Sequence, residues 1–170
     1  ACDELEVTIK GKGGHAALPE KTINPITVAS EMIIKTRESI KQIGKDNLYV
    51  LEYGDFHAYG ASNVIPENAF IKGTFRTMNE SFRKKACDLL LHQSKEIAIK
   101  YGVDCDYKII KGYPSLFNNP RLTKECRELA IDFIGLEKVS DLPIRMASED
   151  FSFYSQECPA CFFRLGVNNK

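Results

Sequence analysis

Two spacings of hydrophobic residues alternate along the first two thirds of the chain, and each predicts a different kind of element. Apolar, β-branched and aromatic residues in short alternating runs predict strands over residues 5–10, 48–59, 69–77 and 103–110. Apolar residues three or four positions apart predict a helix over residues 25–43 and a second helix that begins after a cap at Asn79 or Ser81 and ends at residue 101. The predicted order is therefore strand, helix, strand, strand, helix, strand.

This order is typical of a ferredoxin-like βαββαβ sandwich, in which two helices cover one face of an antiparallel sheet. The sequence thus predicts an α+β fold with a ferredoxin-like domain in residues 1–112. In such a sheet the second and fourth strands lie at the edges, and an exposed edge is usually covered or paired. Because strand 48–59 carries few charges, we expect it to meet its own copy in a two-fold homodimer.

Residues 113–170 contain too few elements to bury their own apolar side chains. The spacing predicts an amphipathic helix over residues 121–134, with five side chains facing inward: Leu122, Cys126, Leu129, Ala130 and Phe133. A strand is predicted over residues 161–167, after an acidic loop near residues 148–151. One helix and one strand do not form a core, so this part is predicted to be an incomplete piece of a larger α/β catalytic domain.

The net charge of the chain indicates which partners are unfavoured, and its cysteines indicate the redox state of its compartment. Lys and Arg number 23, and so do Asp and Glu, so no net field favours nucleic acid or an anionic membrane. The basic residues Arg83, Lys84 and Lys85 are interpreted as a solvated helix face. The six scattered cysteines are interpreted as reduced thiols of a cytoplasmic protein, and redox or half-zinc-site chemistry at Cys158 and Cys161 is the less favoured alternative.

A glycine-rich loop, residues 11–19, places one histidine between the first strand and the first helix. Its glycines and Pro19 allow backbone conformations that present His15 at the tip of the loop. A histidine in such a place can donate a hydrogen bond or carry charge near neutral pH. The alternative is a turn whose histidine only faces water, and the loop by itself leaves both interpretations open.

Four short motifs occur in a fixed order on the predicted elements: Gly-Gly-His-Ala-Ala at 13–17, Asn-Val-Ile-Pro-Glu at 63–67, Gly-Thr-Phe-Arg at 73–76 and Ser-Glu-Asp-Phe at 148–151. In these motifs the chain resembles the amidohydrolase branch of the di-metal metallopeptidases. That branch includes aminoacylases, hippurate hydrolases and auxin-conjugate hydrolases. The resemblance extends over essentially the whole chain.

The resemblance implies a lid domain that also makes a homodimer, followed by a returning part of the catalytic domain. It implies hydrolysis of a small N-acyl or N-aroyl amino acid by metal-activated water, with two divalent ions, Zn or Mn, in the intact protein. The family's Cys-Gly-His-Asp and paired-glutamate ligand segments are not present in this chain. We therefore expect the chain alone to bind no metal and to be inactive.

The resemblance also implies roles for individual residues. His15 would stabilise the negative oxygen of the transition state in the partner subunit, Asn63 would bind the substrate's polar end, and Arg76 would hold its carboxylate. Ser148 and Glu149 would shape the substrate pocket. Glu20 stands where relatives often have a histidine, a departure that bears on substrate preference.

Three alternatives accompany these interpretations. Asn63 could be an ordinary turn residue, and Arg76 an ordinary surface residue of a strand. The domain as a whole could be a non-catalytic ferredoxin-like module that only dimerises or binds a small molecule.

Overall fold

The computed structural model describes residues 1–167 and contains six strands, four α-helices and three short 3-10 helices within them. The strands are β1 (Cys2–Lys10), β2 (Gly14–His15), β3 (Tyr49–His57), β4 (Val64–Ile65), β5 (Asn68–Thr77) and β6 (Asp104–Lys111). The α-helices are α1 (Pro25–Ile43), α2 (Glu80–Tyr101), α3 (Pro120–Ile134) and α4 (Tyr154–Glu157). The 3-10 helices are η1 (Pro19–Lys21), η2 (Leu136–Lys138) and η3 (Asp150–Phe153).

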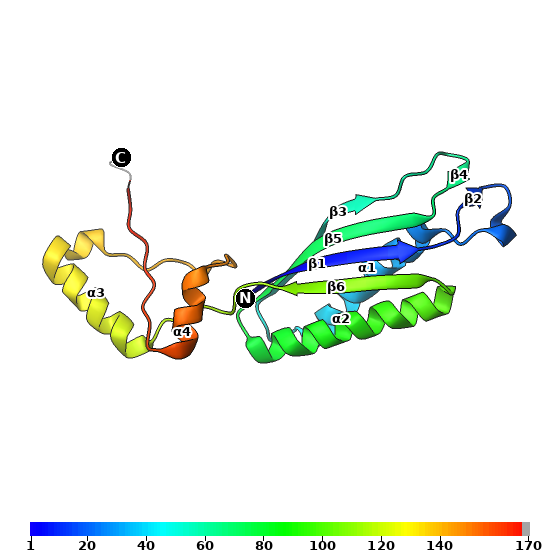
Figure 1. Ribbon diagram of the computed structural model, residues 1–170. Helices are drawn as coiled ribbons and strands as arrows, with labels where there is room; N and C mark the ends of the chain where they lie inside the picture. The colour runs from blue at the N-terminus through cyan, green and yellow to red at the C-terminus, as the bar shows by residue number, and fades with distance from the viewer. Residues whose placement is uncertain (168–170) are drawn as a thin grey trace.

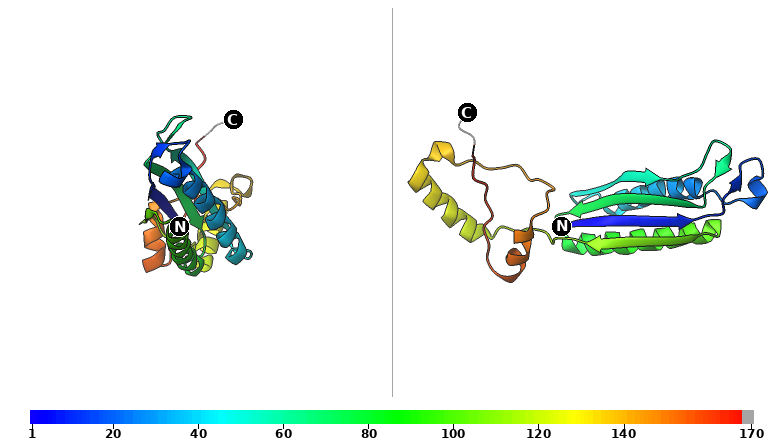
Figure 2. Two further views of the ribbon diagram at one scale, coloured as in Figure 1. Left: turned by 90° about the vertical axis from the view of Figure 1, so that its right-hand side faces the viewer. Right: turned by 45° about the horizontal axis from the view of Figure 1, so that its top comes forward.

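Four long strands form one antiparallel sheet in the order β3-β5-β1-β6. The two helices α1 and α2 pack side by side against the same face of this sheet, as Figures 1 and 2 show. This arrangement confirms the predicted ferredoxin-like sandwich. It also confirms that β3, the predicted strand 48–59, lies at an edge.

Local signals fix where the two long helices begin and end. The side chain of Asn24 accepts a hydrogen bond from the Ile26 backbone N–H at 3.0 Å, and Asn79 accepts one from Phe82 at the same distance. Each asparagine satisfies a donor that the first turn of a helix leaves free. At the other end of α2, Gly102 adopts a left-handed conformation with φ of 65°, which favours glycine.

The core lies between the sheet and the two helices. Its buried apolar side chains come from alternate positions of β1, β3 and β5 and from one face of each helix, among them Leu5, Val7, Ile9, Met32, Ile40, Leu51, Ile71, Phe75, Phe82 and Leu90. The opposite face of the sheet carries polar groups, for example the ion pair between Lys72 Nζ and Glu6 Oε1 at 2.9 Å. The alternation in the sequence therefore gives the sheet one buried and one solvated face.

The remainder of the described chain lies beside one end of this sandwich (Figure 1). Helix α3 occurs as predicted, and three residues of its predicted inward face, Leu122, Cys126 and Ala130, are half-buried. The prediction was wrong for the other two, because Leu129 is 69% exposed and Phe133 is 89% exposed. The predicted strand at residues 161–167 was also wrong, since these residues have no regular secondary structure. The sheets of the described chain contain no strand from residues 161–167, so these residues have no neighbouring strand to pair with.

Candidate functional site

His15 lies at the end of the sandwich farthest from α3 and α4, on the two-residue strand β2 (Figure 1). Strand β2 pairs antiparallel with β4, so that His15 lies opposite Val64. The next residue, Ala16, donates its backbone N–H to the carbonyl of Asn63 at 3.0 Å. The structure therefore brings two of the predicted site residues, His15 and Asn63, into one paired loop structure.

Glycines make the close approach of this loop possible. A Cβ atom on Gly11 would lie 2.3 Å from the Ile23 carbonyl oxygen, and one on Gly13 would lie 2.9 Å from the Ile65 carbonyl oxygen. Both distances are shorter than a side-chain carbon tolerates. Only glycine leaves room at these two positions for one backbone segment to lie directly against another. The histidine loop can therefore pack closely against β4 and against the start of α1.

The imidazole of His15 is exposed and has a defined hydrogen-bond pattern. Its Nδ1 atom accepts the backbone N–H of Ala17 at 3.1 Å. A neutral imidazole that accepts at Nδ1 carries its hydrogen on Nε2. The local fold therefore leaves Nε2–H as the outward donor.

Arg76 lies at the opposite end of β5, beside the acidic loop of the C-terminal part. Its Nη1 donates to the Met146 carbonyl at 2.8 Å, and its Nε donates to Thr74 Oγ1 at 3.4 Å. Ser148 and Glu149 follow Met146 by two and three positions, and the Glu149 carbonyl accepts the Ser152 N–H at 3.1 Å. Arg76 and this loop thus form a second group of predicted site residues.

The two groups do not meet within one chain. His15 and Asn63 are joined to the Asn68 end of β5, whereas Arg76 is near its other end. Eight residue steps along a strand correspond to roughly 27 Å. The candidate site is therefore divided between the two ends of the sandwich.

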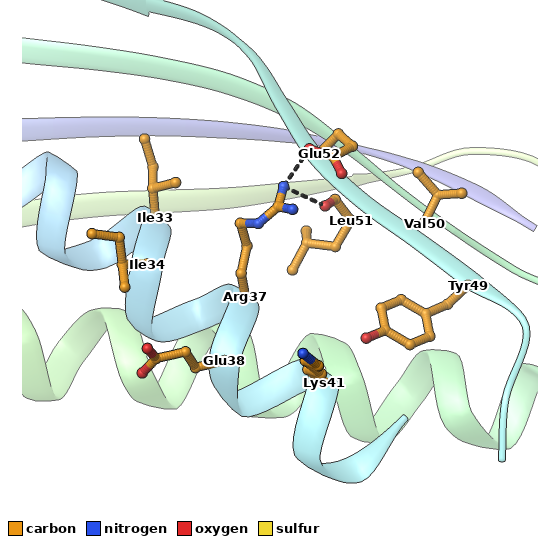
Figure 3. Close-up of a pocket in the computed structure, with 9 residues that line it drawn as sticks. All are labelled: Ile33, Ile34, Arg37, Glu38, Lys41, Tyr49, Val50, Leu51 and Glu52. Atoms are coloured by element: carbon orange, nitrogen blue, oxygen red, sulfur yellow. Dashed lines mark hydrogen bonds and ion pairs between the residues drawn. The ribbon is translucent and has the colours of Figure 1, made fainter. Parts of the chain in front are cut away.

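A groove of about 720 Å³ runs between α1 and the free edge of β3 (Figure 3). Its lining combines apolar side chains such as Ile34 and Val50 with charged ones such as Arg37 and Lys41. Arg37 extends from α1 to β3, where Nη1 donates to the Leu51 carbonyl at 3.2 Å and pairs with the Glu52 carboxylate. Strand β3 has no second neighbour among residues 1–167, so this groove follows an open sheet edge.

Sequence reasoning missed one buried polar cluster. Arg83 was predicted on the solvated face of α2, but it is only 9% exposed and pairs with the carboxylate of Asp3. Helical spacing contained the signal, because position 83 lies on one stripe with Ala86, Leu90 and Ser94. An arginine on a buried stripe requires an acidic partner, and Asp3 supplies it from the neighbouring strand β1.

Within residues 1–167, no group of three or more His, Cys, Asp or Glu side chains is placed to hold a metal ion. The described residues therefore do not fit a metal centre. None of the helices in this range combines the length and apolar character needed to cross a bilayer.

Comparison with known families gives a match over the sandwich. Residues 3–102 match the model of the peptidase dimerisation domain, also called the M20 dimerisation domain. The match covers β1 through the end of α2, including the histidine loop and Arg76.

Two curated relatives match nearly the full chain. Thermostable carboxypeptidase 1 of Saccharolobus solfataricus is 29% identical over 99% of this chain and 42% of its own length. The IAA-amino acid hydrolase ILR1-like 4 of Arabidopsis thaliana is 34% identical over 98% of this chain and 39% of its own length. The chain thus spans about two fifths of the length of these relatives.

A solved structure shares the fold. The dinuclear metal-binding peptidase of the M20 family from Bacillus subtilis superimposes with a TM-score of 0.69 and 24% identity. The superposition covers 94% of this chain and 38% of that protein.

Proposed function

Because the chain belongs to the peptidase dimerisation domain family, we propose that it is the lid and dimerisation segment of a metal-dependent amidohydrolase. In this proposal residues 1–112 form the lid domain and residues 113–170 form part of the catalytic domain. The intact protein hydrolyses the amide bond of small N-acyl or N-aroyl amino acids or small peptides. The name of the Arabidopsis relative, an IAA-amino acid hydrolase, supports this substrate class.

The observation that carries the proposal is the division of the candidate residues between two ends of one sandwich. A two-fold axis beside β3 would pair this edge strand with its own copy antiparallel. The His15 end of one protomer then lies toward the Arg76 end of its partner. The free edge of β3 and the groove along α1 supply the surface for this homodimer.

Each residue has a distinct task in the composite site. His15 donates from Nε2 to the oxygen that becomes negative when water attacks the amide carbon, an interaction that is stronger in the transition state than in the ground state. Arg76 holds the substrate carboxylate with its planar fork of donors. Asn63 offers an amide to the substrate's polar end, and Ser148 and Glu149 form the pocket wall beside Arg76.

We propose that the intact protein carries two divalent metal ions, Zn or Mn, that activate the attacking water. The description of the Bacillus subtilis structure as a dinuclear metal-binding peptidase supports the presence of two metal ions. Residues 1–167 contain no fitting cluster of ligands, so other parts of the intact protein would hold the ions. The six free cysteines fit a reducing cytoplasmic location.

Hydrolysis of a panel of N-acetyl and N-benzoyl amino acids tests this function, with metal content measured in parallel. We expect the intact protein to release the amino acid and to lose this activity on chelation, with recovery when Zn²⁺ or Mn²⁺ is returned. The 170-residue chain alone is expected to show no turnover and no stoichiometric metal. Absence of hydrolysis by the metal-loaded intact protein would instead favour a non-catalytic dimerisation module.

A further inference from the structure

Residues 112–115 connect the sandwich to the C-terminal part, and their glycine and proline are typical of a hinge. The structure shows the opposite of a free hinge. Asp3 is 1% exposed, and its carboxylate accepts the backbone N–H of Gly112 at 3.1 Å. The Gly112 carbonyl accepts Arg83 Nη2 at 3.3 Å, and the Tyr113 carbonyl accepts the Cys2 N–H at 3.1 Å.

A row of oppositely charged side chains continues these hydrogen bonds as far as Ser115. Arg83 donates from Nε to Asp3 Oδ2 at 2.8 Å and from Nη1 to Glu80 Oε2 at 3.1 Å. The other oxygen of Glu80 accepts both the backbone N–H of Ser115 at 2.8 Å and its hydroxyl at 3.0 Å. The four residues of this chain of contacts, called here the junction clamp, are Asp3, Arg83, Glu80 and Ser115.

The pKa shifts of Arg83 and Glu80 both favour the charged forms of these two side chains near neutral pH. Hydrogen bonds from the guanidinium to Asp3 raise the pKa of Arg83 above its ordinary value, so Arg83 stays charged. Partial burial opposes ionisation of Glu80, but the hydrogen bonds from Ser115 and Arg83 lower its pKa overall. Charge-assisted bonds of this kind are the stronger class of hydrogen bond in proteins.

Beyond Ser115 the backbone N–H groups donate to residues of the C-terminal part. The Phe117 N–H donates to Ser155 Oγ at 3.3 Å, and the Asn119 N–H donates to the Ala160 carbonyl at 2.8 Å. Residues from 117 onward are thus held by the C-terminal part. The clamped segment is held by both parts, because the Ser115 carbonyl also accepts Gln156 Nε2 of α4 at 2.9 Å and the ring of Tyr113 packs edge-on against Phe153 at 5.8 Å between centroids.

We propose that the junction clamp makes residues 112–115 a rigid extension of the sandwich, against which Phe153 and Gln156 seat the C-terminal part. The clamp then fixes the direction in which the chain runs from the sandwich into the C-terminal part. It thereby also positions the Met146 loop, whose carbonyl accepts the hydrogen bond from Arg76. Glu80 and Arg83 are positioning residues in this account, since they act through the segment they hold. The link to Arg76 rests on the proposed function, whereas the rigid junction does not.

Hydrogen exchange of the full chain, resolved to single amides, tests the rigid junction in wild type, Glu80→Ala and Glu96→Ala. Glu96 is the matched control, because it lies on the same helix and pairs only with exposed side chains. In Glu80→Ala the Ser115 amide should exchange roughly 10- to 100-fold faster, the loss expected for a bond to a charged group. The Phe75 amide of β5 should keep its wild-type rate, and Glu96→Ala should change neither amide.

Two exchange results would overturn the proposal. One is a Ser115 amide that exchanges in wild type as fast as an unprotected loop. The other is equal acceleration at Ser115 and Phe75 in Glu80→Ala, which would mean general destabilisation.

A kinetic measurement on the intact enzyme tests the positioning role. Glu80→Ala should raise KM for an N-acyl amino acid roughly tenfold with a smaller change in kcat, because displacement of Arg76 weakens binding of the substrate carboxylate. Wild-type KM in this variant would refute the positioning role. If wild type itself turns over no substrate, the proposed function fails, while the exchange data still decide whether the clamp is rigid.

Discussion

At the scale of single residues, the chemistry of this chain depends on where a few polar atoms are held. His15 is exposed, yet the Ala17 N–H fixes the role of Nδ1 and leaves Nε2 as donor. The sequence showed that a histidine would stand in a glycine-rich loop. Its tautomer depends on a contact two residues away in a particular turn, which no residue pattern specifies.

The proposed role of His15 predicts a specific kinetic change. In the intact enzyme His15→Ala should lower kcat by about 10²- to 10³-fold with little change in KM, because the lost donor acts mainly on the transition state. His92→Ala is the control, since His92 is exposed on α2 and pairs only with Glu96. Steady-state kinetics decide, and a His15→Ala enzyme with wild-type kcat would remove His15 from the reaction.

The lowered pKa of Glu80 predicts that the free energy of unfolding depends on pH. Its pKa is lowered in the folded chain from the ordinary value of 4.5, so its stabilising contribution is present above that value and is lost as pH falls through the folded pKa. Glu80→Gln should therefore lower the free energy of unfolding by up to about 1 kcal/mol near neutral pH, a small effect for a partly exposed group.

Urea denaturation of both proteins at successive pH values measures this difference. The gap between wild type and Glu80→Gln should close as the solution becomes acidic. Glu96→Gln, which alters an exposed pair on the same helix, should show no comparable gap. A gap that is constant with pH would contradict a charged Glu80 in the clamp.

At the scale of elements, the sandwich could be read almost entirely from the sequence. The predicted helix 25–43 coincides with α1, and the predicted edge strand 48–59 contains β3. Each of these elements is specified by local periodicity and by a cap or turn residue next to it. Residues 161–167 failed as a strand because a strand also needs a neighbour, and periodicity says nothing about whether one is present.

The groove along α1 and β3 predicts how the homodimer can be separated. Ile34→Lys places a charge in the groove beside Arg37 and Lys41, and the two-fold axis repeats the change on the other protomer. We expect a shift from dimers to folded monomers. Ile99→Lys is the matched control, because Ile99 is 80% exposed on α2 and does not line the groove.

Sedimentation velocity with circular dichroism distinguishes the outcomes. Loss of dimers in Ile34→Lys alone, with helix content retained, supports the α1–β3 interface. A dimer that survives Ile34→Lys unchanged places the interface elsewhere on the molecule.

At the scale of the whole molecule, the central feature is a site whose parts lie at opposite ends of one sandwich. The motifs identified His15, Asn63, Arg76, Ser148 and Glu149, but not their distribution in space. That distribution follows from the topology, because β2 and β4 extend one end of the sheet while the residue 146–149 loop meets Arg76 at the other. We propose that a composite site between two protomers unites these groups.

The most direct test mixes two inactive variants of the intact enzyme, His15→Ala and Arg76→Ala. A heterodimer of the two contains one site with both wild-type residues and one site with neither. When subunits exchange freely in an equal mixture, half of the dimers are heterodimers, so about a quarter of wild-type activity should return. Recovery to this level, with exchange verified by native mass spectrometry, is the predicted result. A fully exchanged mixture no more active than its components would contradict the composite site.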